Sequence, residues 1–190
     1  MRRASFARVV FGTSLAAVLP VPALVAQQAA PACADDPLFA TLDFWVGTWT
    51  VWSGPTQVGT NRITKILQGC AITEEWRSAS GGEGRSLFYV PPGARHWQQV
   101  WVTGGALAPG GTKEKRQRTD SLPGGAIRFE GLIRHGEREW LDRTTLTPNA
   151  DGTVRQVIEI SVDGGATWRP TFDAVYRPVA AAPETPGGER

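Results

Sequence analysis

Histidine is scarce in this sequence of 190 residues, where only His96 and His135 occur. Zinc sites need about four Cys, His or acidic ligands, and the two histidines are not at the spacing of a ligand pair. The sequence also has no Gly-x-Ser-x-Gly segment, the turn that presents a hydrolase serine. We therefore expect no metal site, and a Ser-His-Asp relay has no support.

Acidic residues are missing from the first 26 positions, where Arg2, Arg3 and Arg8 are the charged residues. Without these three, 17 basic residues face 18 acidic ones, and the remaining chain carries a net charge of about −1. A nucleic-acid partner or an anionic membrane surface then lacks its electrostatic basis. The composition, 41% hydrophobic and 20% charged, excludes whole-chain disorder, collagen and a multi-pass membrane protein.

An apolar run from Val9 to Leu19 follows these arginines, stops at Pro20 and Pro22, and leads to Ala26. This order is typical of a secretory signal peptide. We place the cleavage after Ala26, with a cut a few residues downstream as the alternative. The run is shorter than the roughly 20 apolar residues of a membrane span. We therefore expect export to the periplasm or the medium, with no stable membrane insertion after cleavage.

Cysteine occurs twice, as Cys33 and Cys70, which are 37 positions apart. In an oxidising compartment an even count favours a disulfide. Such a bridge would hold the mature N-terminus to the domain and add roughly 3 to 4 kcal/mol of stability. Two unrelated thiols are the alternative.

Short runs of β-rich, alternating residues follow one another after a short helix predicted over Pro37 to Asp43. The turns between them, rich in Gly, Pro, Asn and Asp, leave no room for crossover helices, which favours an antiparallel meander over a parallel sheet. Closure into a barrel would remove the exposed edges. The predicted strands are Gly47–Ser53, Gln57–Leu67, Cys70–Ser78, Gly84–Val90, His96–Thr103, Thr112–Ser121, Ile127–Arg134, Arg138–Thr147, Thr153–Val162 and Thr167–Arg177.

The predicted organisation is therefore a signal peptide (1–26), an N-terminal segment (27–36), one all-β barrel domain (37–178) and a disordered tail (179–190). The tail is predicted to be disordered because it is polar and rich in Pro and Gly.

The first predicted strand begins with "FWVGTWTV", in which Gly47 and Trp49 resemble the Gly-x-Trp signature of lipocalins and the wider calycin group. The resemblance implies that Trp49 packs under one end of the barrel, against an arginine of the closing strand. Arg177, at the end of the last predicted strand, is placed to be that partner.

Further segments resemble an uncharacterised family of exported bacterial lipocalin-like domains. They are "GCAITEEW" (69–76), "HWQQVWV" (96–102) and "DGTVRQVIEISVDGGATW" (151–168), followed by "FDAVYR". This resemblance implies a barrel fold and export. It implies no reaction. Nitrobindin-type haem barrels share Gly-x-Trp, but neither the residues after Trp49 nor the last strand, which has no histidine, fits their pattern. We expect no cofactor.

The segment from Ser161 to Trp168 fits the Asp box of sialidase and other propeller repeats. The box is a hairpin in which Ser161 and Asp163 bond the turn amides, Gly165 takes a positive φ and Trp168 packs beneath. A single copy cannot build propeller blades. We interpret it as a structural hairpin and not as a glycosidase feature.

Aromatic and polar residues alternate on two of the predicted strands. The two-residue period puts Trp97, Gln99 and Trp101 on one face, and Glu74 and Trp76 on one face of another strand. If these faces point inward, they form an aromatic cavity with Gln99 and Glu74 as its polar groups. The alternative is that the indoles are filler and Glu74 is solvated.

The charged stretch from Thr112 to Asp120 is interpreted as a solvated edge or rim, with a rim that attracts an acidic ligand as the alternative. Arg143 lies in a strand-like run, where an inward position would make it part of a buried pair or a ligand clamp.

Three hypotheses for the function remain. The leading one is an exported barrel that binds a small apolar or amphipathic molecule. The second is an enzyme for such a molecule, with Glu74 as acid or base in an apolar pocket that raises its pKa. The third is a structural barrel filled by its own side chains. A cavity of roughly 300 Å³ or more would favour binding over the filled barrel.

Overall fold

The computed structural model describes residue 33 and residues 35–104 and 111–180. The predicted signal peptide (1–26) lies outside these residues, as do most of the predicted N-terminal segment (27–36) and most of the predicted disordered tail (179–190). No helix within the described ranges is long and apolar enough to cross a membrane.

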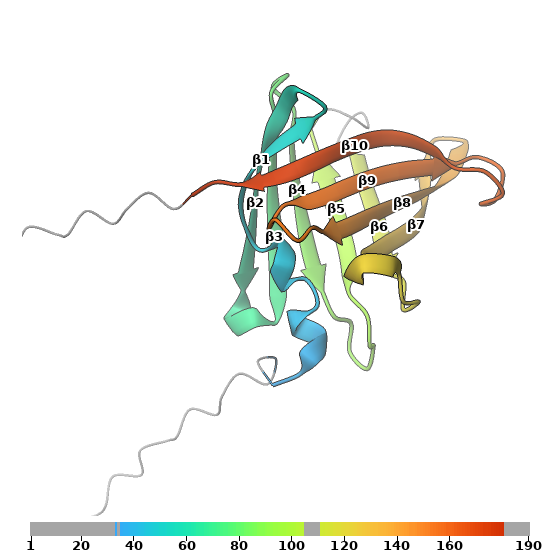
Figure 1. Ribbon diagram of the computed structural model, residues 1–190. Coiled ribbons are helices and arrows are strands. Elements are labelled where there is room, and N and C mark those ends of the chain that lie inside the picture. Colours follow the sequence, from blue (N-terminus) through green and yellow to red (C-terminus); the bar gives the residue numbers. More distant parts are fainter. Residues whose placement is uncertain (1–32, 34, 105–110, 181–190) are drawn as a thin grey trace, which may run out of the picture.

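Ten strands form one closed antiparallel barrel (Figure 1). Each strand pairs with the next along the chain, and the first pairs with the last, which confirms the predicted closed meander. The strands are β1 (Gly47–Ser53), β2 (Thr56–Ile66), β3 (Ala71–Ser78), β4 (Glu83–Tyr89), β5 (Gln98–Thr103), β6 (Gly111–Gln117), β7 (Ile127–His135), β8 (Arg138–Pro148), β9 (Val154–Ser161) and β10 (Arg169–Pro178).

Burial alternates along the strands as a barrel requires. On β4, Ser86 and Phe88 are buried on the inner face, while Arg85 and Leu87 are exposed on the outer face. Gly47 opens β1 with a φ of +151°, a region that side chains disfavour. Strand β6 ends earlier than predicted, because the chain turns into the 3-10 turn η4 (Pro123–Gly125) before β7.

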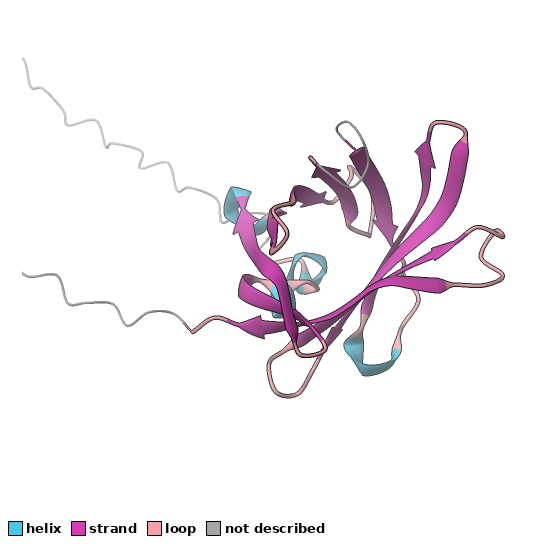
Figure 2. Cartoon of the chain, turned by 90° about the horizontal axis from the view of Figure 1, so that it is seen from above, coloured by secondary structure: helices cyan, strands magenta, loops and turns pink. Residues whose placement is uncertain are grey.

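The predicted short helical segment near the N-terminus is present as two short 3-10 helices, η1 (Pro37–Ala40) and η2 (Asp43–Trp45), which cover one end of the barrel. Figure 2, seen from above, shows helical segments (cyan) within the ring of strands. Leu42 is fully buried there, in a core cluster that includes Phe88 and Phe129. Residues 37–45 therefore supply part of the core at this end of the barrel.

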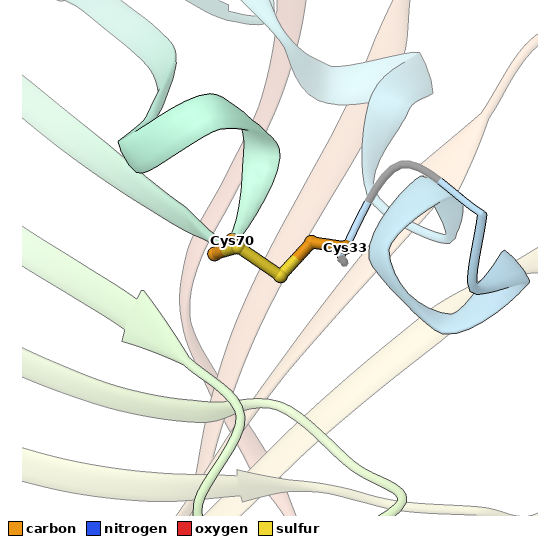
Figure 3. The surroundings of a disulfide bond; sticks show 2 residues. All are labelled: Cys33 and Cys70. Carbon is orange, nitrogen blue, oxygen red and sulfur yellow. A yellow bond between two sulfur atoms is a disulfide. The ribbon is translucent and has the colours of Figure 1, made fainter. Parts of the chain in front are cut away.

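A disulfide joins Cys33 to Cys70, as predicted (Figure 3). Cys70 follows η3 (Leu67–Gly69) and precedes β3, and the Cα atoms of the two cysteines are 5.2 Å apart. The bridge fastens the segment that covers the barrel end to the barrel wall.

The closing pair of strands differs from the calycin expectation. Trp49 is buried, donates its indole N–H to the Trp45 carbonyl over 3.0 Å and packs edge-on to Tyr176. Arg177 points outward, with its guanidinium 4.8 Å from the ring centre of Trp52. The prediction that Trp49 packs against Arg177 is therefore wrong. Because side chains alternate along β10, it is Tyr176 that faces the lumen.

The β9–β10 connection has the geometry of the Asp-box hairpin. The Asp163 carboxylate accepts the Thr167 N–H over 2.9 Å, and the Ser161 hydroxyl accepts the Gly165 N–H over 2.8 Å. Gly165 has a φ of +95°, and Trp168 donates its indole N–H to the Gly165 carbonyl. Hydrogen bonds from Thr167 and Ser161 hold the pKa of the Asp163 carboxyl well below its usual value. All these contacts lie within the turn, as expected for a structural hairpin.

Candidate ligand cavity

A cavity of about 430 Å³ lies inside the barrel. It adjoins the hydrophobic core to which residues 37–45 contribute. Its volume exceeds the roughly 300 Å³ at which small-molecule pockets begin. The barrel is therefore filled only in part by its own side chains. The residues that line the cavity are Val58, Glu74, Trp76, Ser78, Gln99, Trp101, Lys113, Lys115, Thr144, Gln156, Ile158, Phe172 and Tyr176.

Glycines on the inner face make room for the two cavity indoles. A Cβ on Gly84 would stand 2.1 Å from Cη2 of Trp101, and a Cβ on Gly59 would stand 2.5 Å from Cη2 of Trp76. Each indole thus occupies the space that a side chain of the preceding strand would take. Phe172 packs edge-on to Trp76, with ring centres 6.1 Å apart. The result is an aromatic wall that lies close to the strands and leaves the lumen open.

Glu74 belongs to a buried hydrogen-bond network in the cavity. Its carboxylate accepts the Asn61 amide N–H over 2.7 Å and the Ser86 hydroxyl over 2.6 Å. Gln99 in turn donates to the Ser86 oxygen over 3.0 Å. Burial raises the pKa of the Glu74 carboxyl, against the opposing effects of Ser86, Asn61 and the charge of Lys115. The two hydrogen bonds hold Glu74 in place, and burial makes its neutral form more favourable than it is for an exposed carboxyl group.

A second branch of this network reaches the closing strand. Asn61 also donates to the Tyr176 hydroxyl over 3.2 Å, and that hydroxyl donates to Gln156 Oε1 over 2.6 Å. Burial raises the pKa of Tyr176 well above its usual value, so the phenol stays protonated. The buried Oε1 of Gln99 accepts no hydrogen bond from the residues that the structure describes.

Two lysines of β6 reach a single carboxylate on β8. Lys113 Nζ lies 2.5 Å from Asp142 Oδ2, and Lys115 forms an ion pair with Oδ1 and donates to the Thr144 hydroxyl over 2.6 Å. Burial and the neighbouring Lys113 charge lower the pKa of Lys115 to about 8, although Asp142 opposes this shift. Burial disfavours the ionised form of Asp142, but the two ammonium groups outweigh it and lower its pKa. Asp142 is therefore ionised near neutral pH, and a pKa of about 8 leaves Lys115 largely protonated at pH 7.

Gly131 of β7 lies between the lysines and their partner. It stands opposite Asp142 in the β7–β8 register, on the same face as the buried Phe129. A Cβ at Gly131 would stand 2.0 Å from the Glu114 carbonyl oxygen. The glycine therefore lets β7 approach β6 closely and leaves the path from Lys113 and Lys115 to Asp142 open.

The structure brings four of the six predicted ligand residues together in the cavity: Glu74, Trp76, Gln99 and Trp101. Trp97 does not line the cavity. It is fully buried in the core next to η1, where its indole N–H donates to the Leu38 carbonyl and the Thr41 hydroxyl.

Arg143 does not line the cavity. It lies on the outer face, where its guanidinium forms a two-point ion pair with Glu159 and stacks 3.9 Å from the ring centre of Trp168. The parity of β8 explains this placement, because Asp142 and Thr144 take the inner face on either side of Arg143.

Sequence reasoning missed Lys113 and Lys115 because it treated residues 112–120 as one solvated stretch. The two lysines share one parity with the buried Gln117, whereas Glu114 and Arg116 take the exposed one. Their two-residue spacing was the available signal, but both parities of this strand are polar, so hydrophobicity could not tell inside from outside.

The described residues include no group of three His, Cys, Asp or Glu side chains that could hold a metal ion. The cavity instead offers an aromatic wall, a buried carboxyl network and two ammonium groups. No protein-family model matches the sequence, and no curated protein matches it.

Proposed function

We propose that this protein is an exported, calycin-type barrel that binds a small, partly apolar molecule in its cavity. The observation that carries the proposal is the 430 Å³ cavity, whose lining combines aromatic side chains with a few fixed polar groups. Apolar walls with a few placed polar groups are the common build of small-molecule sites.

A matched pair of variants on β9 tests binding. Ile158 lines the cavity, whereas its neighbour Val157 has the opposite parity and belongs to the outer face. The neutral fluorescent probe N-phenyl-1-naphthylamine should bind the wild type saturably, with one molecule per chain. Ile158→Trp places a bulky ring in the lumen and should weaken this binding at least tenfold, while Val157→Trp should leave it unchanged.

Calorimetric titration with a panel of fatty alcohols and terpenoids should give the same order of affinities. The wild type and Val157→Trp should bind alike, and Ile158→Trp should bind more weakly. Absence of saturable binding across the probe and the panel would overturn the proposal. So would equal losses in the two variants, because binding would then lie outside the barrel.

Glu74 carries the competing proposal of an enzyme, since its pKa is raised inside the cavity. Its two oxygens already accept hydrogen bonds from Asn61 and Ser86, which favours a fixed structural acceptor over a mobile proton carrier. Glu74→Gln separates the roles. An acid or base would lose turnover about a hundredfold or more with nearly intact affinity, and a binding residue would change affinity alone.

Export is supported by the disulfide, because such bonds persist in oxidising compartments. Mass analysis of the protein recovered from the periplasm or the medium should give a chain that begins after Ala26, or a few residues downstream, and lacks two hydrogens. A full-length chain with two free thiols, recovered from the cytosol, would contradict export.

A further inference from the structure

Two lysines line the cavity, whereas the carboxylate that they share does not. Lys113 and Lys115 line the cavity, whereas Asp142 is not part of the lining and has no exposed surface. Within the described part of the chain, Asp142 is the carboxylate that pairs with both lysines. Two positive charges thus share one negative charge.

The other carboxyl group of the cavity does not balance this excess. Glu74 is 4% exposed, and its oxygens accept hydrogen bonds from Asn61 and Ser86 rather than from a lysine. Burial also disfavours its charged form. The lining therefore tends toward one uncompensated positive charge, which is costly in a half-enclosed site unless an anion joins it.

The positive groups stand next to the aromatic wall. In the β5–β6 register, Lys113 lies opposite Trp101 and Lys115 lies opposite Gln99. An ammonium group has three N–H donors, and Lys113 directs one of them at Asp142. Because the side chain of Lys113 is 21% exposed, a ligand can reach the other donors. A ligand that lies along the indoles can therefore place a head group on Lys113 without displacing Asp142.

We infer that the ligand is an amphipathic acid, whose carboxylate pairs with the ammonium groups of Lys113 and Lys115 while its apolar body lies along Trp76, Trp101 and Phe172. This inference rests on the proposed binding function and specifies its ligand class. The bound carboxylate becomes the second anion of the lysine pair, opposite Asp142, and each ammonium group then has a carboxylate partner. Such charge-assisted hydrogen bonds are the stronger kind, particularly where solvent is partly excluded.

Three ligands with the same alkyl chain and different head groups test this inference: decanoate, decanol and decylamine. Calorimetric titration at neutral pH and low salt should give a decanoate affinity at least about tenfold higher than that of decanol. Decylamine should bind more weakly than decanol. The neutral alcohol keeps the two proposals apart, because it tests the cavity without testing the charge.

Variants then locate the charge. Lys113→Met should lower the ratio of the decanoate affinity to the decanol affinity about tenfold, since Lys115 still neutralises Asp142 and the excess positive charge is lost. Arg116→Met is the matched control, because Arg116 is an exposed cation on the outer face of the same strand. Asp142→Asn removes the competing carboxylate and should tighten decanoate binding several-fold, an effect that a merely structural role for Asp142 would not produce.

Equal affinities for decanoate and decanol would overturn the acidic-ligand inference and leave the binding barrel standing. Tighter binding of decylamine would also overturn it and would indicate Glu74 as the anchor. Equal effects of Lys113→Met and Arg116→Met would show a general charge effect instead of a site. If none of the three ligands bound, the proposed function itself would lose its support.

Discussion

Gly84→Ala is a sharp test of the aromatic wall, because it adds one methyl group where an indole already lies. The new Cβ would stand 2.1 Å from Cη2 and 2.2 Å from Cζ2 of Trp101. Neither atom can accept such an approach, so the ring must turn away from β4 into the lumen. The substitution should therefore lower stability and also reduce the space available to a ligand.

The size of the effect follows from two opposing contributions. Overpacking of a close-packed site costs typically about 1 to 3 kcal/mol, and replacing a strand glycine by alanine returns about 0.5 to 1 kcal/mol. We expect a net loss of about 1 to 2 kcal/mol for Gly84→Ala. Trp101→Ala should cost less than the roughly 3 to 5 kcal/mol of a fully buried tryptophan, since Trp101 is only half-buried.

The double variant carries the decisive information. Once Trp101 is alanine, the methyl group of Ala at position 84 has free space, so its cost should vanish. The double variant should be more stable than the sum of the single effects predicts by the full overpacking cost, about 1 to 3 kcal/mol, measured by equilibrium denaturation in urea with the disulfide intact.

Gly104→Ala is the control for this cycle, because a Cβ at Gly104 would meet no atom within 4 Å. This variant should stay within about 0.5 kcal/mol of the wild type. Additivity of Gly84→Ala and Trp101→Ala within about 0.3 to 0.5 kcal/mol would show that the indole does not lie over Gly84. The aromatic wall would then have to be abandoned.

Three further predictions concern the barrel end, the closing strands and the cavity carboxyl. Cys70→Ala should lower the free energy of unfolding by about 3 to 4 kcal/mol without changing the far-ultraviolet circular dichroism, and a lost β signal would contradict a bridge that only fastens the end. Arg177→Ala and Trp52→Ala should couple by about 0.5 to 1 kcal/mol in denaturation experiments, whereas Arg177→Ala and Trp49→Ala should be additive; the reverse result would restore the calycin pairing. Burial raises the pKa of Glu74 in the folded protein above its ordinary value of 4.5. Between these two pKa values the folded state therefore binds more protons than the unfolded state. The stability that protonated Glu74 contributes is lost as the pH rises from about 4.5 through the folded pKa. The unfolding free energy of the wild type should therefore fall with pH relative to Glu74→Gln, by at most about 1.4 kcal/mol per pH unit, and parallel profiles would contradict the buried carboxyl.

The barrel could be predicted from the sequence because short β-rich runs follow one another along the chain, separated by turn residues. The two-residue period placed Glu74 with Trp76, and Gln99 with Trp101, on one face of their strands. It did not decide whether these faces point inward, because polar and apolar residues occur on both faces of β3 and β5. The short turns then left a meander as the simplest order of the strands.

The charged half of the cavity could not be predicted for the same physical reason. In β6 both parities are polar, so the strand pattern carries no sign of which side is buried. Lys115 is buried because Asp142 of another strand compensates it, and that pairing depends on the barrel's register. A shift by one position likewise separates Arg177, on the outer face, from Tyr176 in the lumen. A resemblance to a family does not show which of two neighbouring residues on a strand points into the lumen.

Nuclear magnetic resonance of the indole N–H groups gives the most direct test of ligand binding in the barrel. Trp76 and Trp101 line the cavity, whereas Trp52 and Trp168 pack against arginines on the outer face. On titration with decanol, the signals of Trp76 and Trp101 should shift saturably, with one ligand per chain, while those of Trp52 and Trp168 stay in place. Shifts confined to Trp52 and Trp168, or no saturable shift at all, would contradict binding inside the barrel.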